Sequence, residues 1–366
     1  MTMKDILVID CQYDFIDGTL ACAHAEEAVK NIITYINAHP DARVFYSADW
    51  HGPKHCSYIP NGGTWPVHCQ AGTHGAELHA SFSTDIVNPA QRPNATNVYR
   101  KGEDDDLEEY SAYEAWNEAA KKTLSEVVGQ DVLICGIATE FCVKETVLAF
   151  AGSWRNIEIS ASLLGWVDGE GHKKTLEELS ELGEGLGRFS TVIFGGSFGD
   201  SLVVKCCYGA LWSVFHKGEE IKPAQSIIER ISKSAFGEEW GEGEPSKLLA
   251  TAISAAPERE QELRDAFASL GSRPNAPLWA ALLKDKGCRV VCMSKYPAVS
   301  GTIEFVKPQA PGDIEGVIPA KSIFAADDEK ACEAAKEAGF YVICPPYLRD
   351  AAKMLGKMLI GVDVHD

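Results

Sequence analysis

The stretch DVLICGIATEFCVKETVLAF, residues 131–150, joins an apolar run directly to a helical pattern. We predict a buried strand over Asp131–Ile137 and a helix over Glu140–Ala151. Cys142 then lies in the first turn of that helix. A helix N-terminus carries partial positive charge and outward N–H groups, which favour a thiolate and can hold an oxyanion. Two interpretations of Cys142 are open at this point: a buried structural cysteine and a nucleophile.

The same alternation of apolar runs and helices extends on both sides of this stretch. The other expected strands are Lys4–Asp10, Ala42–Ala48, Asn97–Arg100 and Ile157–Leu163. The other expected helices are Ala25–Asn37, Tyr113–Val128 and a segment from about Gly171 to Leu182. Strands that alternate with helices form a parallel sheet covered on both faces, so we predict a three-layer α/β/α domain over residues 1–187.

The pattern begins again after the glycine-rich segment Gly183–Gly187, which predicts a domain boundary. The expected strands of the second part are Ser190–Phe194, Cys288–Met293, Ser322–Ala326 and Phe340–Cys344. Its expected helices are Leu278–Lys286, Glu329–Ala338 and a mostly helical stretch over about Cys206–Leu270 with an acidic break at Gly237–Gly243. We therefore expect a second α/β domain over residues 188–366 with a helical insertion.

Composition and charge exclude several classes of protein. The 366 residues include 34 basic and 53 acidic side chains, and the net charge of −19 disfavours nucleic acid and anionic membranes as partners. No apolar run reaches the roughly 18 residues of a membrane span, and the N-terminus has no signal-peptide pattern. The 12 cysteines form no paired CxxC motif. We therefore expect reduced thiols in a cytoplasmic, globular protein.

Two further residues are expected at the same edge of the sheet as Cys142. Asp10 ends the first expected strand, and Lys101 follows the strand Asn97–Arg100. The carboxyl ends of parallel strands gather at one edge, which allows the three side chains to converge. A carboxylate can take the thiol proton and pass it to a leaving amine, and an ammonium lowers the thiol pKa. Each residue taken alone also fits a capping aspartate or a solvated lysine.

A second polar cluster follows the expected strand Ala42–Ala48. Asp49 and His51 are two residues apart, a spacing that places both side chains on one face of an extended segment. His55 and His68 follow within a short stretch of chain. We predict a metal site built from Asp49, His51 and His68, because a mixed nitrogen and oxygen ligand set suits Zn²⁺, Fe²⁺ or Mn²⁺.

These clusters lie within sequence blocks that resemble a known family. The blocks are VIDCQYDF (8–15), SADWHGPKH (47–55), WPVHCQAGTHGAEL (65–78), RKG (100–102) with YSAYE (110–114), and CGIATEFCVKET (135–146). In this order and spacing they resemble the nicotinamidase/pyrazinamidase branch of the isochorismatase-like cysteine hydrolases, over about residues 4–187. The segment WPVHC favours that branch over the wider family.

The resemblance implies a role for each residue of the two clusters. Cys142 would be the nucleophile, Asp10 the general base, and Lys101 the residue that helps to activate the thiol. One divalent metal, zinc before Fe²⁺ or Mn²⁺, would be bound by Asp49, His51 and His68, with His55 as a fourth ligand that varies in the family.

The resemblance also implies an oxyanion hole and a substrate pocket. A cis peptide between Ile137 and Ala138 would turn the Ala138 N–H toward the Cys142 N–H. A pyridine ring would bind in a pocket lined by Phe15, Trp65 and Ile137. Tyr13 departs from the family pattern, which usually has asparagine there, and this blurs specificity rather than activity.

The activity implied by this resemblance is hydrolysis of nicotinamide, and of pyrazinamide, to the acid and ammonia through a Cys142 thioester, as a step of NAD salvage. Two alternatives stay open: an amidase that acts on another small amide, such as a carbamoyl or ureido compound, and a metabolite-binding or scaffold protein. The expected partner is the small-molecule substrate, and a homo-oligomer is possible on the sequence.

Residues 188–366 resemble, more weakly, the haloacid-dehalogenase-like (HAD) fold. The resemblance lies in PLWAALLKDKGCRVVCMSK (277–295), Lys307–Pro308 and IFAADDEKACEAAKEAGFYVI (323–343). It implies a helical cap over about residues 206–270 and motif residues Ser294, Lys307, Asp327 and Asp328. The nucleophilic aspartate of that family is missing, because GGSFGDSLV (195–203) follows the first strand. We expect a non-catalytic domain; a phosphatase that uses Ser197 or Asp200 with Mg²⁺ is the alternative.

Overall fold

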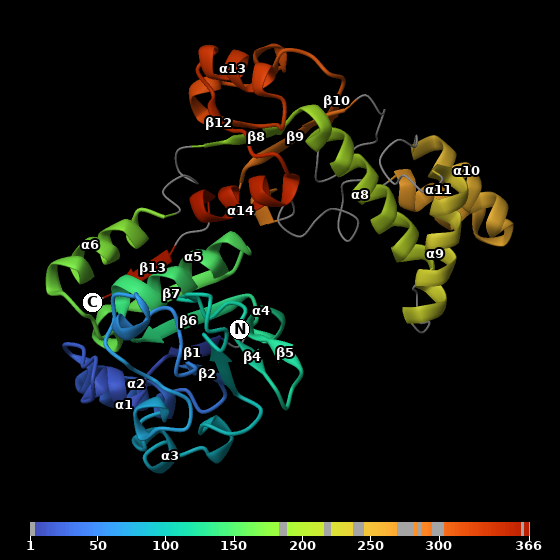
Figure 1. Cartoon of the computed structure of the whole chain (residues 1–366). Helices are drawn as coiled ribbons and strands as arrows, with labels where there is room; N and C mark the ends of the chain where they lie inside the picture. The colour runs from blue at the N-terminus through green and yellow to red at the C-terminus, as the bar shows by residue number, and fades with distance from the viewer. Residues whose placement is uncertain are drawn as a thin grey trace. The chain divides into compact units, whose positions relative to one another are not determined.

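The computed structural model describes residues 4–182, 189–215, 221–236, 245–268, 282–284, 287–294, 304–359 and 362–365. The chain forms two compact units (Figure 1): residues 1–184 together with 355–366, and residues 185–354. The expected boundary near residue 187 assigned the whole C-terminal part to the second domain. The structure instead returns the last twelve residues of the chain to the first unit.

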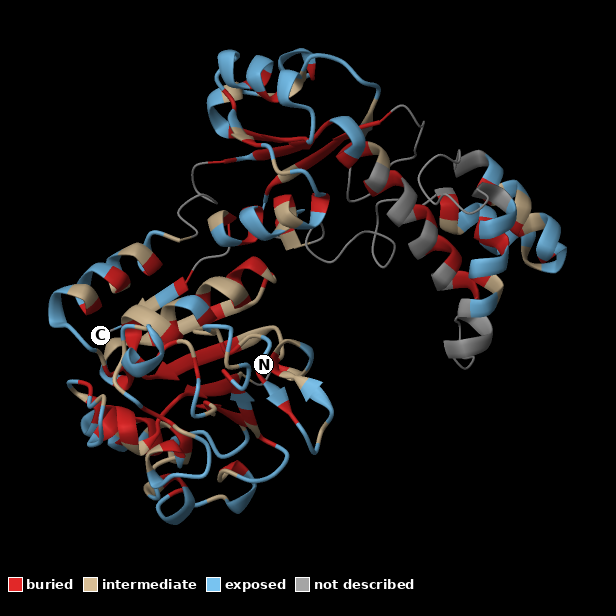
Figure 2. Cartoon of the chain, viewed as in Figure 1, coloured by how far each residue is buried: buried red, intermediate tan, exposed pale blue. Residues whose placement is uncertain are grey.

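The first unit is built on an eight-stranded sheet with the order β13-β7-β6-β1-β2-β3-β4-β5. Its strands are β1 Asp5–Ile9, β2 Val44–Asp49, β3 Val98–Lys101, β4 Trp116–Asn117, β5 Lys122–Thr123, β6 Asp131–Gly136, β7 Asn156–Ser160 and β13 Val362–His365. All pairs from β13 to β3 are parallel, and β4 and β5 add an antiparallel edge. β1 and β2 are buried along their whole length (Figure 2), as central strands covered on both faces must be.

Helices cover this sheet, and the longest of them packs through one apolar face. That helix, α2 Ala25–Ala38, buries Val29, Ile32 and Ile36 in the core, at the spacing of a helical stripe. The other helices of this unit are α1 Tyr13–Ile16, α3 Ser81–Thr84, α4 Leu124–Val127, α5 Lys144–Gly152 and α6 Gly169–Ser180. The predicted α/β fold with a parallel sheet is therefore confirmed for this part of the chain.

The helix predicted over Tyr113–Val128 is wrong. Half of this segment forms the hairpin of β4 and β5, in which Asn117 pairs with Lys122. Lys121 has a left-handed backbone, with φ 53°, which a helix interior does not contain. A capping box formed by Thr123 and Glu126 then begins the short helix α4. The apolar spacing was helical, but the turn and the cap decided the local structure.

The C-terminal strand completes the other edge of the first sheet. β13 pairs in parallel with β7, and Val362 lies opposite Ile157. This pairing joins residues about two hundred positions apart along the sequence, so no local sequence pattern predicts it. The chain passes from the second unit back to the first within helix α14, Leu348–Leu359, which precedes β13.

The second unit contains a five-stranded parallel sheet with the order β10-β9-β8-β11-β12. Its strands are β8 Thr191–Phe194, β9 Arg289–Met293, β10 Glu304–Val306, β11 Ser322–Ala325 and β12 Tyr341–Ile343. Its helices include α8 Gly196–Phe215, α9 Ile221–Phe236, α10 Pro245–Ala255, α11 Glu260–Ala268 and α13 Glu329–Glu337. The helical stretch thus begins at Gly196, directly after β8, and not near Cys206. The predicted boundary Gly183–Gly187, the break Gly237–Gly243 and most of the predicted helix Leu278–Lys286 lie outside the described residues.

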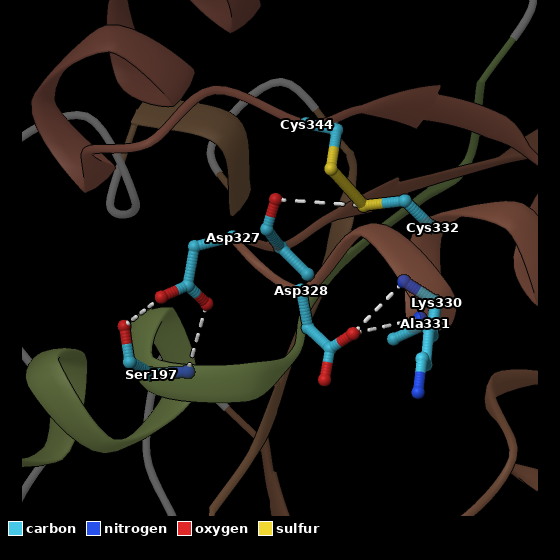
Figure 3. The surroundings of a disulfide bond; sticks show 8 residues. Ser197, Asp327, Asp328, Lys330, Ala331, Cys332 and Cys344 are labelled. Carbon is cyan, nitrogen blue, oxygen red and sulfur yellow. Dashed lines mark hydrogen bonds between the residues drawn. A yellow bond between two sulfur atoms is a disulfide. The ribbon is translucent and has the colours of Figure 1, made fainter.

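One expectation about the cysteines is wrong. Cys332 of α13 and Cys344, just after β12, form a disulfide (Figure 3). The nine other cysteines whose side chains the structure describes are free thiols, and Cys142 is one of them. Among the described helices, none is both long and apolar enough to cross a membrane.

Candidate active site

Asp10, Lys101 and Cys142 meet at the carboxyl edge of the first sheet. Asp10 follows β1, Lys101 ends β3, and Cys142 lies in a π-helical turn, Thr139–Val143, directly after β6. The Lys101 Nζ lies 3.1 Å from Asp10 Oδ2 and 3.5 Å from Cys142 Sγ. None of the three is more than 6% exposed. The predicted convergence is therefore present in the fold.

Burial and charge together set the protonation states of these groups. Burial raises the pKa of the Cys142 thiol well above its ordinary value, and the Lys101 ammonium only partly opposes this. Burial disfavours the Lys101 ammonium as well, but the Asp10 and Asp49 carboxylates outweigh it and raise the Lys101 pKa. The resting site thus holds a neutral thiol beside an ammonium. Cys142 becomes nucleophilic when a base takes its proton, so the helix terminus and Lys101 alone do not make the thiolate.

Asp10 is placed to be that base. Ser47 Oγ donates to Asp10 Oδ1 at 2.6 Å, whereas Asp10 Oδ2 accepts no hydrogen bond from the described residues. A carboxylate oxygen of Asp10, one of Asp49 and the Cys142 sulfur all lie within 4.8 Å of one another. Burial raises the pKa of Asp10, which brings it closer to the range in which a carboxylate exchanges protons readily. Asp10 also adopts φ 46°, a left-handed backbone conformation that is uncommon for residues with a side chain.

The predicted metal ligands form a second buried cluster beside this one. One ligand atom each of Asp49, His51 and His68 lie within 4.8 Å of one another, and all three residues are buried. His51 Nδ1 donates to the Gly102 carbonyl at 2.9 Å and His68 Nδ1 to the Pro66 carbonyl at 2.8 Å. Because a carbonyl only accepts, each ring keeps the lone pair of Nε2 for a ligand bond.

The donor set fits a divalent metal ion. His51 Nε2 is buried and has no hydrogen-bond partner in the described structure, and it lies 3.5 Å from Asp49 Oδ2. The other oxygen, Asp49 Oδ1, is paired with Lys101. Burial favours neutral Asp49, but the Lys101 charge outweighs it and lowers the Asp49 pKa, so that Asp49 is an anionic ligand. Gly102 allows the close approach of His51, since a Cβ there would lie 2.4 Å from the imidazole Cε1.

His55, expected as a variable fourth ligand, is not among these ligand atoms. Its Nε2 lies 3.1 Å from the Leu107 carbonyl and donates to it, and its Nδ1 accepts from the Ser57 N–H at 3.3 Å. Both ring nitrogens are therefore occupied. The ring packs against His51, with centroids 3.9 Å apart, and supports the metal cluster from the side.

Two observations concern the expected oxyanion groups, the N–H groups of Ala138 and Cys142. The Ile137–Ala138 peptide is cis, as the resemblance implied. Ala138 and Cys142 both line one pocket of the first unit. In the described part of the chain, the Ala138 N–H takes part in no hydrogen bond, so it is free to donate into that pocket.

The pocket has aromatic walls, only some of which the sequence identified. Phe15 and Trp65 line it as expected, whereas Ile137 is fully buried and does not. Tyr110 and Phe141 were missed. Trp65 Nε1 donates to the Tyr110 hydroxyl at 3.1 Å, and the Trp65 and Phe141 rings meet edge to face at 5.0 Å. Both missed residues lie within the sequence blocks that indicated the family. Tyr13 lies outside the pocket lining and its hydroxyl accepts from the Ala80 N–H.

Gln12 is a further residue that sequence reasoning missed. Its Nε2 donates to the carbonyls of Asp49 and Ala76, at 2.8 and 2.9 Å, and its Oε1 accepts from the Asp49 N–H at 2.8 Å. Gln12 is fully buried, so it locks the end of β2 that carries Asp49. The available signal in the sequence was the amide side chain of Gln12, two residues after Asp10 at the end of the first strand.

Comparison with known proteins agrees with this geometry. Residues 5–184 match the isochorismatase domain family. The nicotinamidase of Saccharomyces cerevisiae is 29% identical over 181 residues, which are 41% of this chain and 82% of the yeast protein. The nicotinamidase of Acinetobacter baylyi is 30% identical over 167 residues, which are 39% of this chain and 72% of that protein. The chain belongs to the isochorismatase family.

As a member of the isochorismatase family, the chain is an amidohydrolase, and the matching residues lie in its first unit. A crystal structure of the pyrazinamidase of Pyrococcus horikoshii in complex with zinc is 28% identical to it. That match covers 48% of this chain and 93% of the other, with a TM-score of 0.41.

The carboxyl edge of the second sheet is built differently. Asp327 follows β11 and accepts from both the N–H, at 3.0 Å, and the hydroxyl of Ser197 (Figure 3). Asp328 caps α13 by accepting from the N–H groups of Lys330 and Ala331. Ser294 Oγ donates to Asp200 at 2.6 Å. In the described part of this edge no cluster of ligand atoms includes Asp327 or Asp328, so the Mg²⁺ site expected there has no support.

The position directly after β8 has little room for a side chain. Gly195 follows β8, and a Cβ at this position would lie 2.6 Å from Phe324 Cζ and 3.0 Å from Met293 Cε. A carboxylate side chain would need both neighbours to move. Lys307, the expected third-motif lysine, follows β10 as an exposed residue.

Proposed function

We propose that the first unit hydrolyses nicotinamide to nicotinate and ammonia, in NAD salvage. The observation that carries this proposal is one pocket that Cys142 lines together with Asp49 and His68. Asp10 and Lys101 lie beside Cys142, and His51 lies beside Asp49 and His68. The aromatic walls of Phe15 and Trp65 suit a flat heteroaromatic ring. Pyrazinamide differs from nicotinamide by one ring nitrogen, so we expect the same pocket to accept it.

The residues of the chain divide the chemistry between them. Asp10 takes the Cys142 thiol proton, and the sulfur attacks the amide carbon while Lys101 stabilises the negative charge on it. The N–H groups of Ala138 and Cys142 hold the developing oxyanion. The C–N bond then breaks, and Asp10 delivers the proton to the departing ammonia. Asp10 next takes a proton from water, whose oxygen attacks the thioester carbon. The C–S bond then breaks, Asp10 returns the proton to the Cys142 sulfur, and the acid leaves and ionises to the carboxylate in solvent.

A divalent metal held by Asp49, His51 and His68 would supply a positive charge and a Lewis acid to the substrate pocket, which Asp49 and His68 line. Zinc, Fe²⁺ and Mn²⁺ are all compatible with two imidazoles and a carboxylate.

The test is ammonia release from nicotinamide by the full-length protein and by Cys142→Ala. We expect turnover in the wild type and a loss of at least about four orders of magnitude in the variant, because the nucleophile is removed. Circular dichroism and metal content should be unchanged in Cys142→Ala. A variant that retained wild-type turnover would refute the role of Cys142, and a wild type active only on carbamoyl or ureido compounds would refute the substrate.

We propose that the second unit is a HAD-like domain without phosphatase chemistry. Its central strand β8 lies between β9 and β11, and the residues after it bind to the acidic edge instead of leaving a nucleophile there. The absence of aryl phosphate hydrolysis by the full-length protein with Mg²⁺ is the expected result. Hydrolysis that is lost in Asp327→Asn would overturn it.

A further inference from the structure

A buried histidine that the reaction does not use lies directly behind the catalytic turn. His172 belongs to the first turn of α6 and is 7% exposed. Its Nδ1 lies 2.9 Å from the hydroxyl of Thr139. Thr139 begins the turn Thr139–Val143, between Ala138 and Cys142, and is fully buried.

The direction of this hydrogen bond follows from the other bonds of Thr139. The Thr139 hydroxyl donates its only proton to the Gly165 carbonyl at 3.1 Å. It can therefore only accept from His172, whose Nδ1 must carry the hydrogen. Burial lowers the pKa of His172, which favours the neutral ring. His172 is thus a neutral imidazole with a fixed tautomer.

The same carbonyl ties the turn to the neighbouring loop. The Thr139 N–H also donates to the Gly165 carbonyl, at 2.9 Å. Gly165 packs against Ile137, since a Cβ on it would lie 3.1 Å from Ile137 Cγ1. Two residues farther along, Val167 lines the pocket. The Thr139 bonds therefore connect the residue after Ala138 to the loop that carries Val167, a wall of the substrate pocket.

An aromatic stack holds His172 in this position. The Trp166 ring stacks on His172, with ring centroids 4.2 Å apart, and on His24, with centroids 4.8 Å apart. His24 is in turn fixed by a 2.8 Å bond between its Nδ1 and the Leu164 carbonyl. The stack restrains the imidazole plane, so its N–H is aimed at Thr139 before substrate arrives.

We propose that His172 is a positioning residue for the oxyanion hole: through Thr139 it fixes the turn that presents the Ala138 and Cys142 N–H groups. His172 does not touch the substrate. Its effect is on the stabilisation of the tetrahedral intermediate and not on binding of the planar amide. This inference rests on the amidase function proposed above.

Two variants separate the effect of the His172 N–H donor from the effect of its ring shape. His172→Phe keeps a flat ring for the stack but has no N–H, whereas His172→Asn places an amide N–H at the same distance from the backbone. For nicotinamide we expect kcat to fall about tenfold in His172→Phe, with KM within about twofold of the wild type. We expect His172→Asn to recover most of kcat. The matched control is His39→Ala, at the exposed end of α2, with unchanged kinetics.

Two further readouts distinguish this role from a general structural one. Pyridine-3-carboxaldehyde should add to the Cys142 thiol and mimic the tetrahedral intermediate, so its inhibition constant should rise in His172→Phe in proportion to the loss of kcat. Binding of nicotinate should not change. Hydrogen exchange of peptides covering residues 137–143 should be faster in His172→Phe and close to wild type in His172→Asn.

The outcomes are distinct. If His172→Phe keeps the wild-type kcat and exchange, the positioning role is wrong. If kcat falls and KM also changes by more than about twofold in both variants, or if His172→Asn does not recover kcat, the histidine is only structural and the proposal is overturned. If the wild type does not hydrolyse nicotinamide, the proposed function fails, and hydrogen exchange alone still decides whether His172 orders the turn.

Discussion

The carboxyl edges of the two sheets start from the same geometry and differ in how their polar groups are satisfied. At the first edge, Asp10 and Lys101 are buried and pair with each other at 3.1 Å, and His51 Nε2 has no hydrogen-bond partner in the described structure. At the second edge, Ser197 and Asp327 are exposed and bond to each other. A parallel sheet offers a crevice, but chemistry needs groups that are desolvated and still free to bind a ligand.

The largest expected effect tests the metal cluster of the first edge. His51→Ala should lower bound metal from about one ion per chain to near zero, because it removes a buried ligand nitrogen of the Asp49/His51/His68 cluster. Amide turnover should fall by at least about a hundredfold. Metal content measured by mass spectrometry after dialysis, with turnover on the same sample, checks both.

The matched control is His55→Ala. Both nitrogens of His55 are engaged by Leu107 and Ser57, so we expect metal content to stay near that of the wild type. Loss of metal in His55→Ala equal to that in His51→Ala would restore His55 as a ligand and contradict the difference between the two histidines.

The next prediction, with an intermediate expected effect on the free energy of unfolding, concerns the disulfide of the second unit. Cys332 and Cys344 are twelve residues apart, and closing a loop of this length stabilises a folded unit by about 3 kcal/mol. Reduction, or Cys344→Ser, should lower the free energy of unfolding of the second unit by about that amount. Thermal unfolding with and without reductant measures it.

Thiol titration in denaturant provides the control for this comparison. Two more thiols should react after reduction than before it, and amide hydrolysis by the first unit should survive reduction, since Cys142 is a free thiol. Equal thiol counts before and after reduction would show that the second edge holds no disulfide.

The smallest expected effect tests whether the second edge is a site at all. Ser197→Ala removes the hydroxyl bond to Asp327 at an exposed position and should cost about 1 kcal/mol in denaturant unfolding. Amide turnover should not change. An aryl phosphatase activity that is present in the wild type and absent in Ser197→Ala would show that the second edge is also an active site. That result would contradict the difference proposed between the two edges.

Local sequence patterns predicted the central strands well, and the errors have identifiable causes. β1 and β6 are short apolar runs bounded by polar residues, and burial on both faces leaves few other structures for them. The segment Tyr113–Val128 has helical apolar spacing, but the left-handed Lys121 and the capping Thr123 made it a hairpin. The pairing of β13 with β7 depends on contacts distant along the chain, which no local window contains.

The candidate site divides in the same way. Residue types and spacing identified Asp10, Lys101 and Cys142 and the ligand set Asp49, His51 and His68, because such chemistry needs specific groups at strand ends. The sequence did not predict that Tyr110 and Phe141 line the pocket. It also did not predict the hydrogen bonds by which Gln12 holds the end of β2. Aromatic and amide side chains serve many purposes, and only their neighbours in space reveal which one applies.

The sequence by itself determined the central strands, the family and the candidate reacting groups, because apolar periodicity and residue chemistry are properties of the chain. The tertiary structure decided what those groups do at rest. Burial keeps Cys142 a thiol, leaves His51 Nε2 without a partner, turns His55 away from the ligand set and closes the space at Gly195 with Phe324. These outcomes depend on desolvation and on distances between residues far apart in the sequence, and both exist only in the folded state.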